Sequence, residues 1–147
     1  MKDDPRTLVS TDWLETHLKD PDLRILDASW YLPDSGRDAR AEYKAAHIPG
    51  ARFFDIDEIS DQRSGLPHMA PPPEKFVSRM RAMGVGDGHQ VVVYDGAGLF
   101  SAARVCRRFA NRWGIGAPRR RQLSSAASPR DPACSSKTFP VCSTKRI

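Results

Sequence analysis

Long hydrophobic runs are absent from this sequence of 147 residues. No stretch approaches the ~20 consecutive apolar residues that a membrane-spanning helix needs. The first ten residues, MKDDPRTLVS, also lack the basic, apolar and small-residue regions of a secretory signal peptide. We therefore expect no association with a membrane and a cytoplasmic location.

Cysteine is scarce, and its three copies all lie in the last third of the chain, at Cys106, Cys134 and Cys142. They do not form a paired framework, and no Cys-x-x-Cys motif is present. The sequence thus gives no indication of a zinc or dithiol site, and we expect neither a metal nor a cofactor. Cys106 falls within a predicted helix rather than in a loop that would stabilise a thiolate, which predicts an incidental helix residue.

Acidic residues are almost absent from the end of the chain. Residues 1–104 carry 13 Lys and Arg against 17 Asp and Glu, whereas residues 105–147 carry 10 Lys and Arg against a single Asp. Residues 114–147 are rich in Arg, Ser, Ala and Pro and show neither helical nor strand periodicity, which predicts an irregular, disordered basic tail. A basic tail can bind nucleic acid, but no recognition helix or aromatic stacking pattern accompanies it, so this function is the least favoured.

Helical and strand patterns alternate in the part that precedes the tail. Short strands separated by helices predict crossover connections and a parallel sheet flanked by helices, an α/β fold. The predicted elements are a helix from Ser10 or Thr11, a strand over 23–30, a helix over 39–47, a turn at Pro49 and Gly50, a strand over 52–54, a helix from Pro73 to Gly84, a strand over 90–95 and a helix over 101–113.

Aspartates follow several of these strands, at Asp27, Asp55, Asp57 and Asp95. In parallel sheets ligands bind at the carboxyl ends of strands, so these residues are candidates for a site. Asp is also common in such turns because it caps helices and bonds to nearby amides. For each residue the local structural role is the favoured interpretation.

Several stretches together resemble the N-terminal half of the two-domain rhodanese and 3-mercaptopyruvate sulfurtransferase family. The resemblance covers roughly residues 8–105 and rests on the order and spacing of VSTDWLETHL, RILDASWYLP, AEYKAAHIPGARFFDIDEISDQRSGLPHMAPPPEKF and GVGDGHQVVVYDGAGLFSAARV. It implies a rhodanese-like domain over residues 8–113. It also implies a small-molecule sulfur donor and acceptor, with sulfur passing from thiosulfate or 3-mercaptopyruvate through a Cys persulfide to cyanide or a thiol.

The resemblance further implies that the catalytic Cys lies in a loop of a second, C-terminal domain, which would be the partner of this one. The corresponding loop here is a pseudo-active-site loop, formed by Asp95, Gly96, Ala97, Gly98, Leu99, Phe100 and Ser101. Asp95 stands where the Cys would be. A carboxylate can accept bonds from the same amides as a thiolate but cannot carry a sulfur atom. We therefore expect no turnover from this chain alone; the alternative is a non-catalytic binding or interface module.

Two accessory residues follow from the same resemblance. In mercaptopyruvate sulfurtransferases an Asp and a His of the N-terminal domain approach the catalytic loop, and these align with Asp57 and His68. A carboxylate can orient an imidazole that moves a proton near neutral pH. The alternative is that His68 is a solvated histidine in a proline-rich turn. His47, before the Pro-Gly turn, is interpreted as structural.

The family pattern ends near Val105, where the charge also changes sign. Our hypothesis is a frameshift near residues 105–109 of a GC-rich gene, which would make residues 114–147 an out-of-frame product. The sheet would then lack a strand and its covering helix. An unpaired edge and exposed apolar surface would favour aggregation of a truncated domain.

Overall fold

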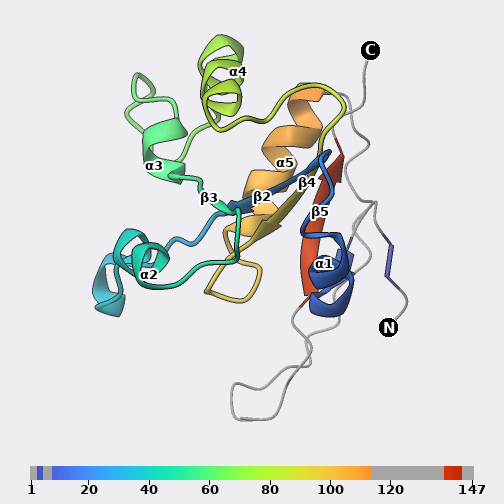
Figure 1. Ribbon diagram of the computed structural model, residues 1–147. Helices are drawn as coiled ribbons and strands as arrows, with labels where there is room; N and C mark the ends of the chain where they lie inside the picture. The colour runs from blue at the N-terminus through green and yellow to red at the C-terminus, as the bar shows by residue number, and fades with distance from the viewer. Residues whose placement is uncertain (1–2, 5–7, 114–137, 144–147) are drawn as a thin grey trace.

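Five strands form one sheet in the computed structural model, which describes residues 3–4, 8–113 and 138–143. The order across the sheet is β1 (Leu8–Ser10), β5 (Thr138–Ser143), β4 (Gln90–Tyr94), β2 (Leu23–Asp27) and β3 (Arg52–Phe53) (Figure 1). β2 is parallel to both β3 and β4, whereas β5 is antiparallel to both β1 and β4. The parallel strands, each joined to the next through helices, confirm the predicted α/β fold.

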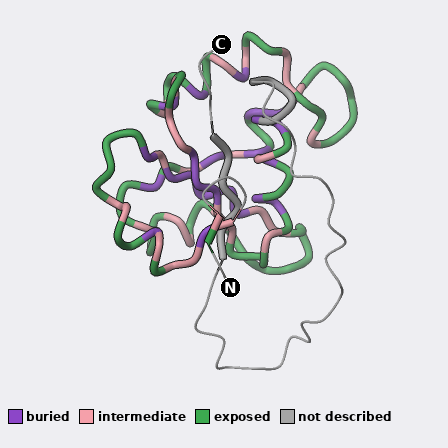
Figure 2. Tube along the Cα trace, turned by 90° about the vertical axis from the view of Figure 1, so that its right-hand side faces the viewer, coloured by how far each residue is buried: buried purple, intermediate pink, exposed green. Residues whose placement is uncertain are grey.

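Helices cover both faces of this sheet. They are α1 (Thr11–His17), α2 (Ala39–Ala45), α3 (Ile56–Ile59), α4 (Pro73–Ala82) and α5 (Ala102–Trp113), with a short 3-10 turn at Pro33–Ser35. On β4, Val91 and Val93 pack into the core shared with α3, α4 and α5, while Val92 packs into the core shared with α1. Figure 2 shows buried segments concentrated towards the middle of the molecule. The VVV run is therefore apolar because both of its faces are covered.

Local signals explain why the predicted helices begin and end where they do. The Ser10 hydroxyl caps α1 by accepting from the N–H of Trp13 at 3.2 Å. Pro73 opens α4, where its missing N–H costs nothing, and Gly84 follows α4 with a φ of 72°. The Pro49–Gly50 turn closes through a 2.9 Å bond from Ala51 N to Ile48 O. These predicted features are confirmed.

The short helix α3 was not predicted. Its N-cap residue, Asp55, was one of the candidate site residues. Asp55 accepts hydrogen bonds from the N–H groups of Asp57 and Glu58, both at 3.1 Å, and its carboxylate pairs with Arg40. Burial raises the pKa of Asp55, but the Glu58 amide and the Arg40 guanidinium outweigh it, and the net pKa lies below the ordinary value. Asp55 thus has the local structural role.

β5 corrects the prediction for the end of the chain. Residues 138–143 pair with Leu8–Ser10 on one side and with residues 90–92 on the other. The expectations of no strand there, and of an unpaired edge where a strand is lost, are therefore wrong for this segment. β1 and β4 would otherwise leave unpaired N–H and C=O groups facing each other, and a segment containing Thr, Phe and Val satisfies them. Residues 114–137 and 144–147 of the predicted tail lie outside the described residues.

Cysteine pairing is a second correction. Cys106, on α5, is disulfide-bonded, so the prediction that the cysteines do not pair is wrong for this residue.

Candidate functional site

The loop after β4 is built around the side chain of Asp95. Its Oδ1 accepts from the backbone N–H groups of Ala97 and Leu99, at 3.0 and 2.8 Å. Its Oδ2 accepts from the N–H groups of Ser101 and Ala102, both at 2.8 Å, and from the Ser101 hydroxyl at 3.2 Å. The loop thus folds its amides inward around one anionic group at the N-terminus of α5.

That anionic group belongs to the chain itself. An external anion could reach these amides only by displacing Asp95, whose carboxylate already takes up their bonds. Residues 95–101 contain no cysteine. A positive φ of 69° at Leu99 helps to turn the loop amides inward, a conformation that is costly for a residue with a side chain. The loop amides are thus arranged to bind an anion, and the Asp95 carboxylate already occupies that position.

The cluster of Tyr31, Arg37 and Glu42 holds the other side of this loop. Arg37 lies over the Tyr31 ring at 3.8 Å, bonds to both Glu42 oxygens and donates to Gly96 O at 3.3 Å. The bonds from Arg37, and then from Tyr31, lower the pKa of Glu42. Sequence reasoning missed this cluster, because its members are separated along the chain and form no motif.

Asp57 and His68 lie next to each other in the structure. His68 Nδ1 lies 2.9 Å from Asp57 Oδ1. The contact does not have the angles of a hydrogen bond, and Nδ1 is buried without such a partner among the described residues. It is an ion pair when the imidazole is protonated, since charge attraction depends on distance rather than on that angle. His68 also has a φ of 57°, a strained value for a residue with a side chain.

Arg108 supports His68 from α5. Its Nη2 donates to His68 O at 2.9 Å, while its Nη1 is buried and lacks a hydrogen-bond partner in the described part of the chain. Arg108 is only 8% exposed. Burial, and then the charge of Arg104, lower the pKa of Arg108.

Several large apolar side chains are exposed. Among the described residues they are Leu32, Leu66, Met69 and Phe100, with exposed fractions of 62%, 61%, 43% and 62%. Leu66 and Met69 flank His68 along the chain, and Phe100 stacks 6.5 Å from Trp30, whose ring meets His68. The surface beside Asp57 and His68 is therefore apolar.

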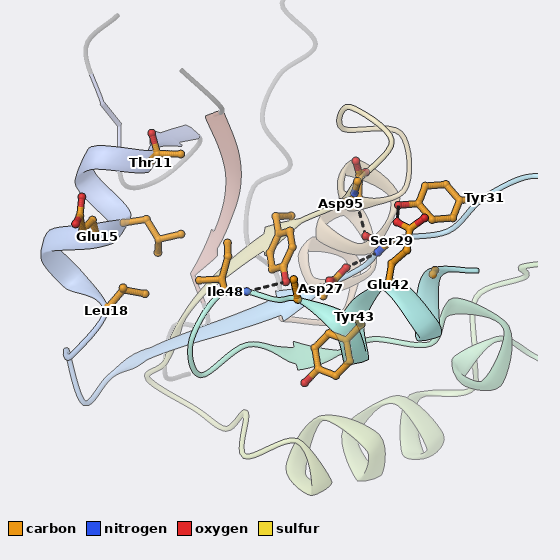
Figure 3. Close-up of a pocket in the computed structure, with 15 residues that line it drawn as sticks. Thr11, Glu15, Leu18, Asp27, Ser29, Tyr31, Glu42, Tyr43, Ile48 and Asp95 are labelled. Atoms are coloured by element: carbon orange, nitrogen blue, oxygen red, sulfur yellow. Dashed lines mark hydrogen bonds between the residues drawn. The ribbon is translucent and has the colours of Figure 1, made fainter. Parts of the chain in front are cut away.

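A cavity of about 450 Å³ opens on the other side of the Asp95 loop, between α1, α2 and the ends of β2 and β4 (Figure 3). Among the described residues, its lining includes Glu15, Asp27, Glu42 and Asp95 and no cationic side chain. Burial raises the pKa of Tyr94, whose hydroxyl accepts from Ile48 N in the same cavity. An anionic sulfur donor would be repelled here, which separates this cavity from the chemistry suggested by Asp57 and His68.

Asp27 and His47 have local roles. Asp27 is buried and accepts from Ser29 N at 2.9 Å, which shapes the end of β2. The His47 ring stacks on Tyr43 at 4.2 Å, and its Nδ1 lies 2.8 Å from Tyr43 O. Both residues stabilise the turns that follow β2 and α2.

Comparison with known proteins decides the family. Residues 10–118 match the model of the Rhodanese-like domain. The chain belongs to the rhodanese-like family. Its rhodanese-like residues include the Asp95 loop and both members of the Asp57–His68 pair.

The curated relatives of this rhodanese-like chain are sulfurtransferases. It is 56% identical over 98 residues to thiosulfate/3-mercaptopyruvate sulfurtransferase 1, mitochondrial, of Arabidopsis thaliana, covering 67% of this chain and 26% of that protein. It is 50% identical over 106 residues to human 3-mercaptopyruvate sulfurtransferase, covering 68% and 36%. The chain thus spans about a quarter to a third of the length of these relatives.

Solved structures agree. The crystal structure of SseA from Escherichia coli, a 3-mercaptopyruvate sulfotransferase by its description, shares 47% identity with a TM-score of 0.60, covering 64% of this chain and 36% of that one. Tum1 of Saccharomyces cerevisiae shares 34% identity with a TM-score of 0.60, covering 71% and 35%. Within the described residues, none of the helices has the length and apolar character to cross a membrane.

Proposed function

We propose that this chain is the non-catalytic N-terminal domain of a sulfurtransferase, a truncated form that does not turn over substrate alone. The observation that carries the proposal is Asp95, which occupies the loop cradle through five hydrogen bonds. Sulfur transfer through a persulfide needs a thiolate at such a site, and a carboxylate cannot replace it. The domain would extend over residues 8–113.

The proposed reaction moves sulfur from thiosulfate or 3-mercaptopyruvate, through a Cys persulfide on a separate catalytic domain, to cyanide or a thiol. The names of the relatives support these donors. Asp57 and His68 would face that catalytic domain and assist proton movement at its loop, because an imidazole beside a carboxylate exchanges protons near neutral pH.

An assay of the purified chain with both donors tests the absence of turnover. We expect no product above the uncatalysed rate with either thiosulfate and cyanide or 3-mercaptopyruvate and a thiol. A variant in which Cys106, Cys134 and Cys142 are all replaced by Ser is the control. Turnover by the chain that survives in this variant would show that persulfide chemistry is not involved.

Mixing with a catalytic domain tests the role of the Asp57–His68 pair. The C-terminal half of a sulfurtransferase relative, purified separately, should gain activity when this chain is added. His68→Gln should reduce that gain at least about tenfold, in line with loss of a general acid–base. His17→Gln, on α1, is the matched control. Equal gains from both variants would remove His68 from the mechanism.

Sequencing the gene downstream of codon 105 tests the proposed origin of residues 114–147. A shifted reading frame there should encode the remainder of a sulfurtransferase. Its absence would refute the frameshift.

A second candidate function is a non-catalytic interface module. The exposed apolar side chains of Leu32, Leu66, Met69 and Phe100 favour it, because exposed apolar surface suits a protein partner. A Phe100→Ser variant should lose a partner that the wild-type chain retains, while Ala103→Ser, also exposed, should keep it. Identical retention by both variants would exclude this surface.

A further inference from the structure

Trp30 lies between the Asp57–His68 pair and the Asp95 loop and touches both. Its Nε1 donates to Asp57 Oδ2 at 3.2 Å. Its ring meets the His68 ring edge-on, with centroids 4.8 Å apart and planes at 79°. Trp30 also stacks on Phe100 of the loop, at 6.5 Å and 21°.

Asp57 needs such a contact to hold one orientation. Its side chain is 62% exposed and projects from α3, a helix of only four residues. An exposed aspartate carboxylate rotates readily about the Cβ–Cγ bond. Because Oδ2 accepts from Trp30, the other oxygen, Oδ1, is the one that faces His68 Nδ1 at 2.9 Å.

The position of Trp30 is itself fixed by the fold. It follows Ser29 at the end of β2, and the buried Ser29 accepts from Gly96 N through its hydroxyl at 2.9 Å. Ser29 thus connects the segment after β2 to the Asp95 loop, and Trp30 connects the same segment to the Asp57–His68 pair.

We propose that Trp30 is a positioning residue for the Asp57–His68 pair: it selects the carboxylate orientation in which the charge on Oδ1, 2.9 Å from Nδ1, favours the neutral His68 tautomer with its proton on Nδ1, although the contact lacks the angles of a hydrogen bond. Nε2 is then left as the proton acceptor, and no hydrogen bond of Nε2 is present among the described residues. A role of this proton arrangement in sulfur transfer rests on the proposed function. The arrangement itself is a property of this chain and can be measured without a substrate.

The test is NMR spectroscopy of the full chain with ¹⁵N-labelled histidine, in alkaline solution where the imidazoles are neutral. The His68 signals are assigned by their loss in His68→Gln. We expect the Nδ1–H tautomer to dominate in the wild type. In Trp30→Phe, which keeps an aromatic ring but removes the N–H, its ratio to the Nε2–H form should fall about threefold or more. Trp13→Phe, on α1, is the matched control and should leave the ratio unchanged.

A tautomer ratio that stays the same in Trp30→Phe overturns the proposal, as does a wild type in which Nε2–H dominates. A second measurement does not depend on the stability of that variant. The indole N–H resonance of Trp30 should move to the position of a free indole in Asp57→Ala, which removes the acceptor, and an unmoved resonance also overturns the proposal. A failed activity test with the catalytic domain would instead refute the proposed function. It would not change the spectra expected for the His68 tautomer and the Trp30 indole.

Discussion

Arg108 carries its charge on the face of α5 that packs against the core. One guanidinium nitrogen donates to His68 O, but another is buried and unpaired among the described residues. A buried charge that is only partly satisfied lowers stability, and an apolar residue of similar volume often restores it.

We therefore predict that Arg108→Met raises the free energy of unfolding by about 1 kcal/mol, despite losing the bond to His68 O. Urea denaturation followed by circular dichroism measures the change. The adjacent Arg107 is exposed, and Arg107→Met should change stability by less than about 0.5 kcal/mol. A loss of stability in Arg108→Met would mean that the bond to His68 O outweighs the buried charge.

Asp95 leads to a second prediction at this scale. Asp95→Ala leaves four backbone N–H groups and a hydroxyl without their acceptor. It should cost about 2–4 kcal/mol in stability.

Because the cradle is then open, sulfate should bind in it and restore part of the loss, about 2.7 kcal/mol at 100 times its dissociation constant. Thermal unfolding in sodium sulfate and in sodium chloride of equal ionic strength measures this. The wild type is the control, and its transition should show a smaller difference between the two salts. Equal salt responses of the two proteins would mean that the loop does not form an anion site once Asp95 is removed.

The short helix α3 depends on ionised Asp55, which caps it and pairs with Arg40. The pKa of Asp55 is lowered in the folded protein. The stability that its charge contributes is therefore complete above the ordinary Asp pKa and is lost as the pH falls through the lower folded value.

Asp55→Asn keeps a capping oxygen but removes the charge, so we predict a loss of about 0.5–1 kcal/mol near neutral pH. The difference from the wild type should disappear in acid, below the folded pKa of Asp55. Chemical denaturation across the acidic pH range measures this. Asp12→Asn, exposed in the first turn of α1, is a control for general charge effects. A difference that is constant with pH would contradict the ionic contribution.

The elements that were predicted correctly are those specified by neighbours in sequence. Ser10 caps α1, Pro73 opens α4, and the Pro49–Gly50 turn closes on itself, so each can be inferred from a few adjacent residues. α3 was missed because four residues are too few to show a helical period.

The candidate site was harder to predict, because its geometry is made by contacts between distant residues. Asp57 and His68 were paired only through the family resemblance, since nothing in their spacing predicts a 2.9 Å contact. Trp30 was not singled out, because its indole meets both residues only after β2 and α3 have come together. Arg108 lies in a helix that any sequence pattern would predict, but its burial depends on the packing of α5.

At the scale of the whole molecule, β5 determines whether the sheet is continuous. Deleting residues 138–147 would leave β1 and β4 with facing, unpaired edges. We predict that this variant unfolds at least about 5 °C lower than the full chain.

It should also aggregate faster, because open strand edges pair with other chains. Thermal unfolding followed by light scattering, in reducing buffer, measures both effects. Deleting only residues 144–147 keeps β5 and is the control. Coincident transitions for the two deletions would show that β5 does not hold the sheet together.

The pairing of β1 with β5 also fixes the order of events while the protein is being made. The strand nearest the start of the chain finds its neighbour in the strand nearest its end. During synthesis, β1 must remain without that partner until residues 138–143 have emerged, although the α/β unit from β2 to α5 is already complete. Contacts between distant parts of a chain form slowly, so the growing polypeptide passes through a period with an open sheet.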